Sequence, residues 1–290
     1  MLEFVSPPVL ALCAAVIFGA TVLCARFSMN HVSPSNGAWL TILPTALLFW
    51  VFALATLSWQ DFMSPWVFFF AAIGIAQPYI SLQLSFQGTR RLGPTVSATV
   101  ASTAPMFSLL LAMALLGEQP RLVHGVGTFA IVSGVVILSW QGGGTKDWAA
   151  LAVLFPLGTA ILRGLAQTGS KYGMEELPIP LLAALCSHTA AFLLGWLLRG
   201  FSWKALTREV SPGGWRWIGL TGSGNALAIW ALYAALKEGE VIQVSPIVAA
   251  FPLFTMLFSR IFFRQEVFGV RVALGVLLIV PGVVAITVVG

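Results

Sequence analysis

The stretch TAPMFSLLLAMALLGEQ, residues 103–119, places a proline inside an apolar run that ends on a glycine and a carboxylate. Near the C-terminus, AFPLFTMLFSRIFFRQE, residues 250–266, has the same order, with a proline in an apolar run and a glutamate at the end. A proline inside a helix removes one backbone hydrogen bond and bends the helix. The recurrence of this pattern predicts that the chain consists of two related halves.

Composition indicates a membrane protein, because 58% of the 290 residues are hydrophobic and only 9% are charged. So few charges could not cover the surface of a soluble protein of this size. Helices need about 20 apolar residues to cross a hydrocarbon layer of roughly 30 Å. The sequence predicts ten such helices, joined by short connectors, at about residues 8–26, 37–57, 65–87, 94–116, 122–140, 148–168, 178–198, 214–236, 241–263 and 267–289.

Several other classes of protein are disfavoured. The first apolar run follows no Lys or Arg and has no small-residue cleavage pattern, so we expect a retained helix rather than a signal peptide. The three cysteines, Cys13, Cys24 and Cys186, lie in apolar runs and are expected to be core residues rather than metal ligands or nucleophiles. The segment QGGGTK, residues 141–146, lacks the spacing of a phosphate-binding loop. We therefore expect no metal, no cofactor and no direct use of ATP.

The net charge of +5 comes from Lys and Arg residues scattered over short connectors, as is usual beside membrane helices, and predicts no nucleic-acid partner. The connectors after odd-numbered helices hold eleven of these residues, and those after even-numbered helices hold three. Cytoplasmic loops are the ones enriched in Lys and Arg. The count therefore predicts that both termini lie outside the cytoplasm.

The two halves align when Pro105 is matched to Pro252, at an offset of 147 residues. The offset places Pro78 on Asn225 and, after one inserted residue, matches Glu118 to Glu266, Gly127 to Gly275 and Gly134 to Gly282. Each half has five helices, an odd number, so the second half is inverted in the membrane. Inverted repeats are a transporter architecture with the binding site near the midplane. We predict an all-α polytopic protein of ten transmembrane helices in two inverted five-helix repeats, residues 1–141 and 147–290.

This half-repeat resembles the drug/metabolite transporter superfamily, specifically its EamA-like ten-helix members. The resemblance is carried by the central proline, the Gly117-Glu118 ending of the fourth helix, the spaced glycines of the fifth, and the Phe18-Gly19 and Leu157-Gly158 steps. It implies two five-helix bundles around a central cavity, alternating access in the inner membrane, and a small metabolite as cargo, often an amino acid leaving a bacterial cell. Family members usually keep their termini in the cytoplasm, against the charge count, so orientation stays open.

The sequence departs from the family at two places. An arginine that is common early in the family's second helix is missing, since Trp39 and Thr41 occupy that neighbourhood. In the second half, Arg264-Gln265-Glu266 replaces the Gly-Glu ending.

Prolines mark the middle of the predicted helices. Pro78, Pro105 and Pro252, with Asn225 as the counterpart of Pro78, are expected to weaken four helices at one depth, where a cavity or hinge would form. Membrane helices also tolerate proline without a functional reason. All ten acidic residues lie near the ends of the predicted helices, so no acid is expected deep in the membrane. This argues against a carrier of hydrophobic cations. The ten acids are Glu3, Asp61, Glu118, Asp147, Glu175, Glu176, Glu209, Glu238, Glu240 and Glu266.

Two ionisable side chains fall inside apolar runs. His188 is a candidate proton relay or substrate donor, and the alternative is a neutral histidine bonded to a neighbouring helix. Arg163 could offer a fork of donors to a carboxylate or phosphate, and the alternative is that it snorkels to the interface or pairs structurally. Further candidates, each with helix-to-helix bonding as the alternative, are Gln77, Tyr79, Asn225, Trp230 and Ser245. The spaced glycines of the fifth and tenth helices predict close packing.

The leading hypothesis is a secondary active transporter, not an enzyme, that exports an amino acid or related organic acid, with Arg163 holding the anionic group and His188 coupling transport to protons. Trp230 and Tyr79 would line the apolar side. The alternative is a transporter or flippase of a phosphorylated or lipid-linked headgroup that uses Arg163 with Arg90 and Arg91. A membrane enzyme is disfavoured because the chain has no catalytic cluster at a suitable depth.

Overall fold

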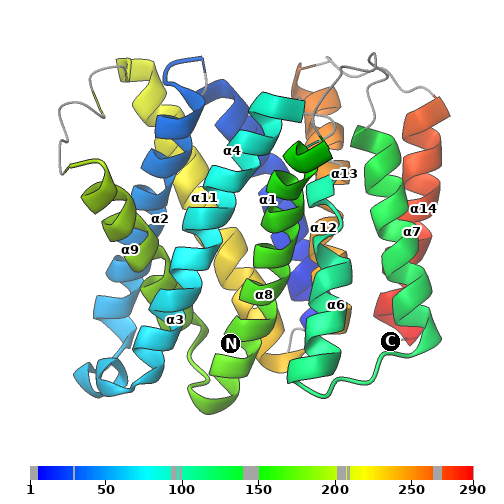
Figure 1. Cartoon of the computed structure of the whole chain (residues 1–290), viewed down its shortest axis with the longest axis horizontal. Helices are drawn as coiled ribbons and strands as arrows, with labels where there is room; N and C mark the ends of the chain where they lie inside the picture. Colours follow the sequence, from blue (N-terminus) through cyan, green and yellow to red (C-terminus); the bar gives the residue numbers. More distant parts are fainter. Residues whose placement is uncertain are drawn as a thin grey trace.

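The protein forms a bundle of helices that run roughly side by side (Figure 1). The computed structural model describes residues 6–28, 30–92, 97, 100–139, 150–200, 207, 210–263 and 270–289. The first half contains α1 (Pro7–Ser28), α2 (Pro34–Thr56), the 3-10 helix η1 (Trp59–Met63), α3 (Trp66–Gly74), the π-helical segment η2 (Ile75–Ile80), α4 (Ser81–Leu92), α6 (Ala104–Leu115) and α7 (Leu122–Ser139).

The second half contains η3 (Ala150–Val153), α8 (Leu154–Glu176), α9 (Pro180–Leu198), α11 (Pro212–Glu238), α12 (Val241–Ala249), α13 (Phe251–Phe258), the π-helical segment η4 (Ser259–Phe263) and α14 (Val270–Val289). Six of the described helices are long and apolar enough to cross a membrane, and three shorter helices are also apolar. Since α3, η2 and α4 form one span, and α12, α13 and η4 another, the described residues make ten spans. The prediction of five helices in each half is confirmed.

Alternate spans run in opposite directions, so α1 begins and α14 ends at the same end of the bundle (Figure 1). We call this end the terminus side. The odd-numbered spans end at the other end of the bundle, which we call the basic side after the Lys and Arg residues that follow those spans in the sequence. Which side faces the cytoplasm stays a prediction from the charge count.

The two halves are interleaved. Helix α1 packs against α11, α12 and α13 of the second half, and its counterpart α8 packs against α3, α4 and α6 of the first. Equivalent helices also pair across the halves, α2 with α9, α7 with α14 and α6 with α12, and α9 packs on α3 as α2 packs on α11. Exchanging the halves leaves this set of contacts unchanged, as inverted repeats require. Two groups of helices result: the α1 group (α1, α11, α12 and α13) and the α8 group (α8, α3, α4 and α6).

Glycines let α7 and α14 pack closely. A Cβ added at Gly134 would lie 2.8 Å from the carbonyl oxygen of Gly275, and one at Gly127 would lie 3.2 Å from that of Gly282. Backbones can approach this closely only where neither helix carries a side chain. The predicted close packing of these glycines is therefore confirmed, and their partners are each other.

The prolines interrupt spans rather than bend continuous helices. Helix α6 begins at Ala104 and α13 at Phe251, so Pro105 and Pro252 occupy first turns. In a first turn the missing proline N–H leaves no hydrogen bond unmade. In the third span Gln77 leaves the helical region, with φ −142° and ψ 117°, because a residue before proline is pushed toward extended backbone.

The expected weakening at Asn225 is wrong. Helix α11 runs unbroken from Pro212 to Glu238 through this position. Asparagine keeps its backbone N–H, so the helical hydrogen bonds continue, unlike at the matching Pro78.

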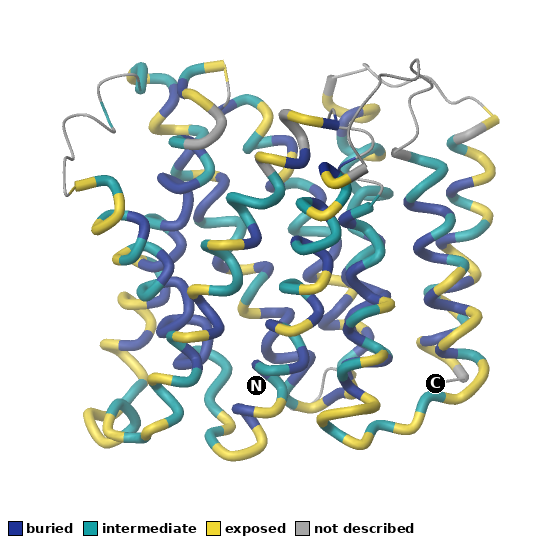
Figure 2. The backbone as a smooth tube through the Cα atoms, viewed as in Figure 1, coloured by how far each residue is buried: buried dark blue, intermediate teal, exposed yellow. Residues whose placement is uncertain are grey.

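Buried residues lie on the sides of the helices that face one another, and exposed residues lie on the outer sides (Figure 2). The exposed positions include many large apolar side chains, such as Leu54, Phe68 and Leu122, which are 80% or more exposed. Such a surface suits lipid rather than water.

We expect Gly134→Ala to destabilise the α7–α14 pair, because the new methyl would meet the Gly275 carbonyl, which is backbone and cannot turn away. Overpacking of this kind costs about 1–3 kcal/mol, which a thermal unfolding assay in detergent would register as a lower Tm. Gly125→Ala on the same helix is the matched control, since nothing lies within 4 Å of its added methyl. Equal melting temperatures for the two variants would contradict the packing role.

Candidate functional site

Arg163, His188 and Asn225 lie near the middle of three spans of the second half. They are the tenth of 23 residues in α8, the ninth of 19 in α9 and the fourteenth of 27 in α11. All three spans cross the same layer, so these polar side chains share a depth. Which way each one faces follows from the exposed residues around it, because successive residues are turned by about 100° in an α-helix.

Arg163 faces the interior of the bundle. Ile161 and Leu165, both 40% exposed, mark the outer side of α8, and each is two residues, or about 200°, from Arg163. The side chain of Arg163 is surrounded by protein and yet keeps some accessible surface. This position and direction disfavour snorkelling to the lipid interface.

Arg163 has no neutralising partner in the part of the chain that the structure describes. Among the described residues none forms a hydrogen bond or ion pair with its guanidinium. The carboxylates that the structure describes lie at helix ends or in connectors: Asp61, Glu118, Glu175, Glu176, Glu238 and Glu240. Structural pairing with an acid is therefore disfavoured as well, and the guanidinium remains available to an anion.

Asn225 also points inward. Leu220 and Leu227, 56% and 52% exposed, lie on the outer side of α11, and each is roughly opposite Asn225 around the helix. Its side chain is partly accessible, and no partner for its amide occurs in the part of the chain that the structure describes. An unpaired amide on an inner face can bind a polar ligand.

His188 is buried and bonded on one side. Its Nδ1 donates to the carbonyl oxygen of Ala184 at 2.8 Å and lies 3.2 Å from Ser187 Oγ, while Phe49 packs edge-on at 5.5 Å between ring centroids. Because a carbonyl only accepts, Nδ1 carries a proton, and Nε2 of the neutral ring is left as an acceptor. The ring is thus oriented by its own helix.

Gln77 and Ser245 take part in bonds between side chains. Gln77 accepts a hydrogen bond from the Ser81 hydroxyl beside the break in the third span. Ser245 of α12 donates to Ser108 Oγ at 3.0 Å, which in turn lies 3.3 Å from Gln167 Oε1 of α8. The cluster of Ser245, Ser108 and Gln167 thus links α12 of the α1 group to α6 and α8 of the α8 group. Sequence reasoning missed Ser108, because an isolated serine in an apolar run carries no distinguishing signal.

Tyr79 and Trp230 have other surroundings. Tyr79 packs at the edge of an aromatic cluster with Trp39, Phe192 and Trp196. In this cluster Arg199, the residue after α9, lies 5.2 Å above the Trp39 ring.

Trp230, 38% exposed, lines a groove of about 280 Å³ on the terminus side of the bundle. Residues at the ends of α1, α2, α9 and α11 line this groove, and Lys237 and Glu238 are among them. Of the basic pair in the alternative hypothesis, Arg91 lies 4.5 Å above the Phe155 ring, while the side chain of Arg90 lies outside the described residues, as do Arg264, Gln265 and Glu266.

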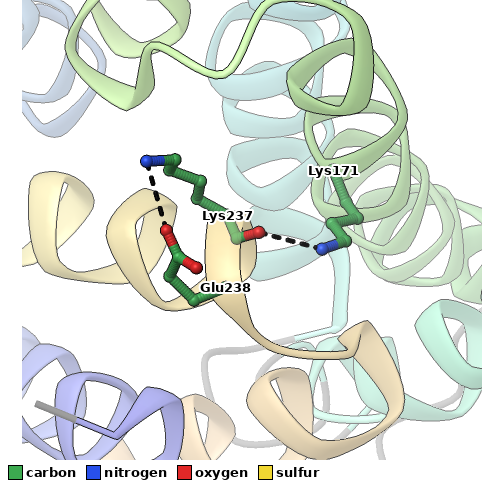
Figure 3. A network of polar contacts seen from close by, with 3 residues as sticks. All are labelled: Lys171, Lys237 and Glu238. Atoms are coloured by element: carbon green, nitrogen blue, oxygen red, sulfur yellow. Dashed lines mark hydrogen bonds and ion pairs between the residues drawn. The ribbon is translucent and has the colours of Figure 1, made fainter. Parts of the chain in front are cut away.

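Lys171, Lys237 and Glu238 form a local group of charged residues at the terminus side. Lys237 forms an ion pair with Glu238 at 3.1 Å, and its carbonyl oxygen accepts a hydrogen bond at 3.0 Å from Lys171 of α8 (Figure 3). Nearby, both carboxylate oxygens of Glu118 accept hydrogen bonds from the first backbone N–H groups of α12. Across the ranges that the structure describes, no group of three or more His, Cys, Asp or Glu side chains could hold a metal ion.

Comparison with known proteins agrees with this architecture. The model of the EamA-like transporter family matches residues 6–140 and again residues 150–288. The fold is similar to that of a solved crystal structure, with a TM-score of 0.80, 97% of this chain and 96% of the other covered, and 19% identity. At that identity the likeness shows the fold alone. No curated protein matches the sequence. The two family matches together cover nearly the whole chain, and this multi-pass membrane protein belongs to the EamA-like transporter family.

Proposed function

We propose that the protein is a secondary active transporter that exports a small metabolite with an anionic group, an amino acid or a related organic acid, across the inner membrane by alternating access. The observation that carries the proposal is Arg163, an inward-facing guanidinium at mid-depth with no acid beside it among the described residues. Asn225 would bind a second polar group of the same substrate.

An unpaired arginine at the centre of a membrane protein favours an anionic ligand for a physical reason. Placing a charged side chain at mid-membrane costs about 2.5–3.5 kcal/mol even on the mildest scales. A carboxylate can form two parallel hydrogen bonds with a guanidinium and cancels its charge. The substrate thus lowers the cost of any state in which Arg163 is sealed from water.

This differential stabilisation supports alternating access. A ligand shifts a conformational equilibrium only by the difference in its affinity for the two states. An anion that compensates Arg163 stabilises the occluded state more than the open states, in which water can solvate the charge. Passage between the two open states should therefore be faster with substrate bound, so that exchange of substrate exceeds net flux.

The interruptions of the third, fourth and ninth spans support the same proposal. Broken helices in membrane proteins are tolerated where the backbone faces protein or a water-filled cavity. Pro78, Pro105 and Pro252 lie at these breaks, one in η2 and the others in the first turns of α6 and α13. In the proposed mechanism, the backbone beside them bends as the helix groups move.

The groove at Trp230 favours a second candidate, transport of a phosphorylated or lipid-linked headgroup. Its lining combines the partly exposed ring of Trp230 with Lys237. A lipid-linked cargo would enter such a groove sideways from the bilayer. In this case, Trp230→Ala with Lys237→Gln should abolish transport of a lipid-linked substrate, whereas export of a soluble acid should be unaffected.

For the leading candidate, we expect Arg163→Ala to reduce counterflow of the preferred anion in proteoliposomes by roughly 10- to 100-fold, as for losing a hydrogen bond to a charged group. The panel would contain amino acids, amines, organic acids and sugar phosphates. Arg163→Lys should be intermediate, because an ammonium keeps the charge but not the fork.

Arg216→Ala, near the basic-side end of α11, is the matched control for loss of a positive charge, and it should leave counterflow unchanged. Full counterflow in Arg163→Ala would exclude the anion-binding role. Uptake restricted to amines would exclude the anionic substrate class itself.

We expect His188→Gln to uncouple transport from protons. Counterflow needs no proton gradient and should persist, whereas uphill transport driven by a pH difference should be lost, because glutamine has no titratable nitrogen. Ser187→Ala next to it serves as the control for loss of the Nδ1 contact. Equal gradient-driven transport in wild type and His188→Gln would show that His188 is only a packing residue.

A further inference from the structure

The N-terminus of α12 is capped by a residue of the other half of the chain. The N–H groups of Val241 and Ile242 have no acceptor within their own helix, as at the start of any α-helix. The residue before them, Glu240, makes no side-chain cap. Instead, Glu118 Oε1 accepts from Val241 N at 2.8 Å and Glu118 Oε2 from Ile242 N at 2.9 Å.

A glycine places this carboxylate. Helix α6 ends at Leu115, and Gly117 has a φ of +68°, a left-handed conformation that side chains disfavour. The turn brings Glu118 N within 3.3 Å of the Ala112 carbonyl and directs the glutamate side chain across to α12. Gly117 therefore forms the turn after α6, and Glu118 caps α12.

The two ends of this contact belong to different helix groups. Glu118 follows α6 in the α8 group, whereas Val241 and Ile242 begin α12 in the α1 group. Lys171 forms a parallel link, since it donates from α8 to the last turn of α11 (Figure 3). Both links lie on the terminus side, so they close the same end of the molecule.

We propose that Glu118 is a positioning residue for transport: its bonds to α12, here called the Glu118 clamp, hold the terminus side closed and release when that side opens. The inference rests on the alternating access proposed above, because only such a mechanism requires the helix groups to separate at one end. It assigns a role to a residue remote from Arg163.

The two hydrogen bonds of the clamp are short, but the carboxylate that accepts them is partly buried. Burial raises the pKa of the Glu118 carboxyl, and the hydrogen bonds from Ile242 and Val241 offset only part of that effect. The nearby Glu240 raises this pKa further, while Lys171 lowers it. Opening of the terminus side would return this carboxylate to water, where its charge is better solvated.

The test measures opening directly and needs no substrate. Spin labels at Gln119→Cys and Val9→Cys, exposed terminus-side positions of the α8 and α1 groups, report their separation by pulsed electron resonance in nanodiscs. Cys13, Cys24 and Cys186 are replaced by alanine in this background.

We expect Glu118→Gln to shift the closed-to-open ratio by roughly five- to tenfold toward longer distances, because an amide can accept from only one of the two N–H groups and carries no charge. Glu175→Gln, an exposed acid at the same end of α8, is the matched control and should leave the distances as in wild type.

Val241→Pro tests the same contact from the other side and serves if Glu118→Gln fails to fold. Proline suits the first position of a helix and deletes only the N–H that bonds Glu118 Oε1. It should lengthen the distances in the same direction. Unchanged distances in a folded Glu118→Gln or Val241→Pro variant, or equal lengthening in Glu175→Gln, would overturn the clamp. Neither result depends on which substrate is carried, so failure here is distinct from failure of the transport proposal.

Discussion

In the hydrocarbon layer every backbone N–H and C=O group must be hydrogen-bonded within the protein, and this constraint shapes the whole molecule. Because of this constraint, the apolar runs of the chain cross the layer as ten helical spans. It also decides where a span can break, because a freed carbonyl or N–H needs an acceptor, a donor or water. The breaks at Gln77 and before Phe251 occur beside prolines, where one N–H is already absent. At the start of α12 the same need is met by a carboxylate from the other half of the chain.

Close approach of helices is the second condition for the fold. Apolar side chains are as stable in lipid as in a protein interior, so the hydrophobic effect does not drive helices together in a membrane. The helices associate through tight packing and interhelical hydrogen bonds. Glycines supply the packing at α7 and α14, and at Gly222, where an added Cβ would lie 2.7 Å from the Thr41 carbonyl of α2. Hydroxyl groups supply the bonds, as between Thr45 and the Gly222 carbonyl at 2.9 Å. These contacts connect the halves in an interleaved order, and so the interior surface is built from both.

The candidate site shows how far residue chemistry can be read without coordinates. A charge or an imidazole in an apolar run stands out from its neighbours, so Arg163 and His188 could be identified from the sequence. Their inward direction depends on which faces of α8 and α9 meet other helices, and uniformly apolar helices give little indication of that. The same lack of a polar face means that the sequence could not show that Trp230 lines a terminus-side groove. Glu118 was visible as a motif, but its partner is more than a hundred residues away in the chain.

The sequence by itself determined the membrane class, the ten spans and the two inverted halves, because hydropathy, span length and a repeated proline and glycine pattern are local or periodic properties of the chain. Only the tertiary structure decided that each half's first helix packs on the other half, that Pro105 and Pro252 begin new helices, and that Glu118 caps α12. Those features depend on which surfaces meet. Packing and hydrogen bonds between segments far apart in the chain decide which helix surfaces come into contact. A local sequence pattern does not specify such a distant partner.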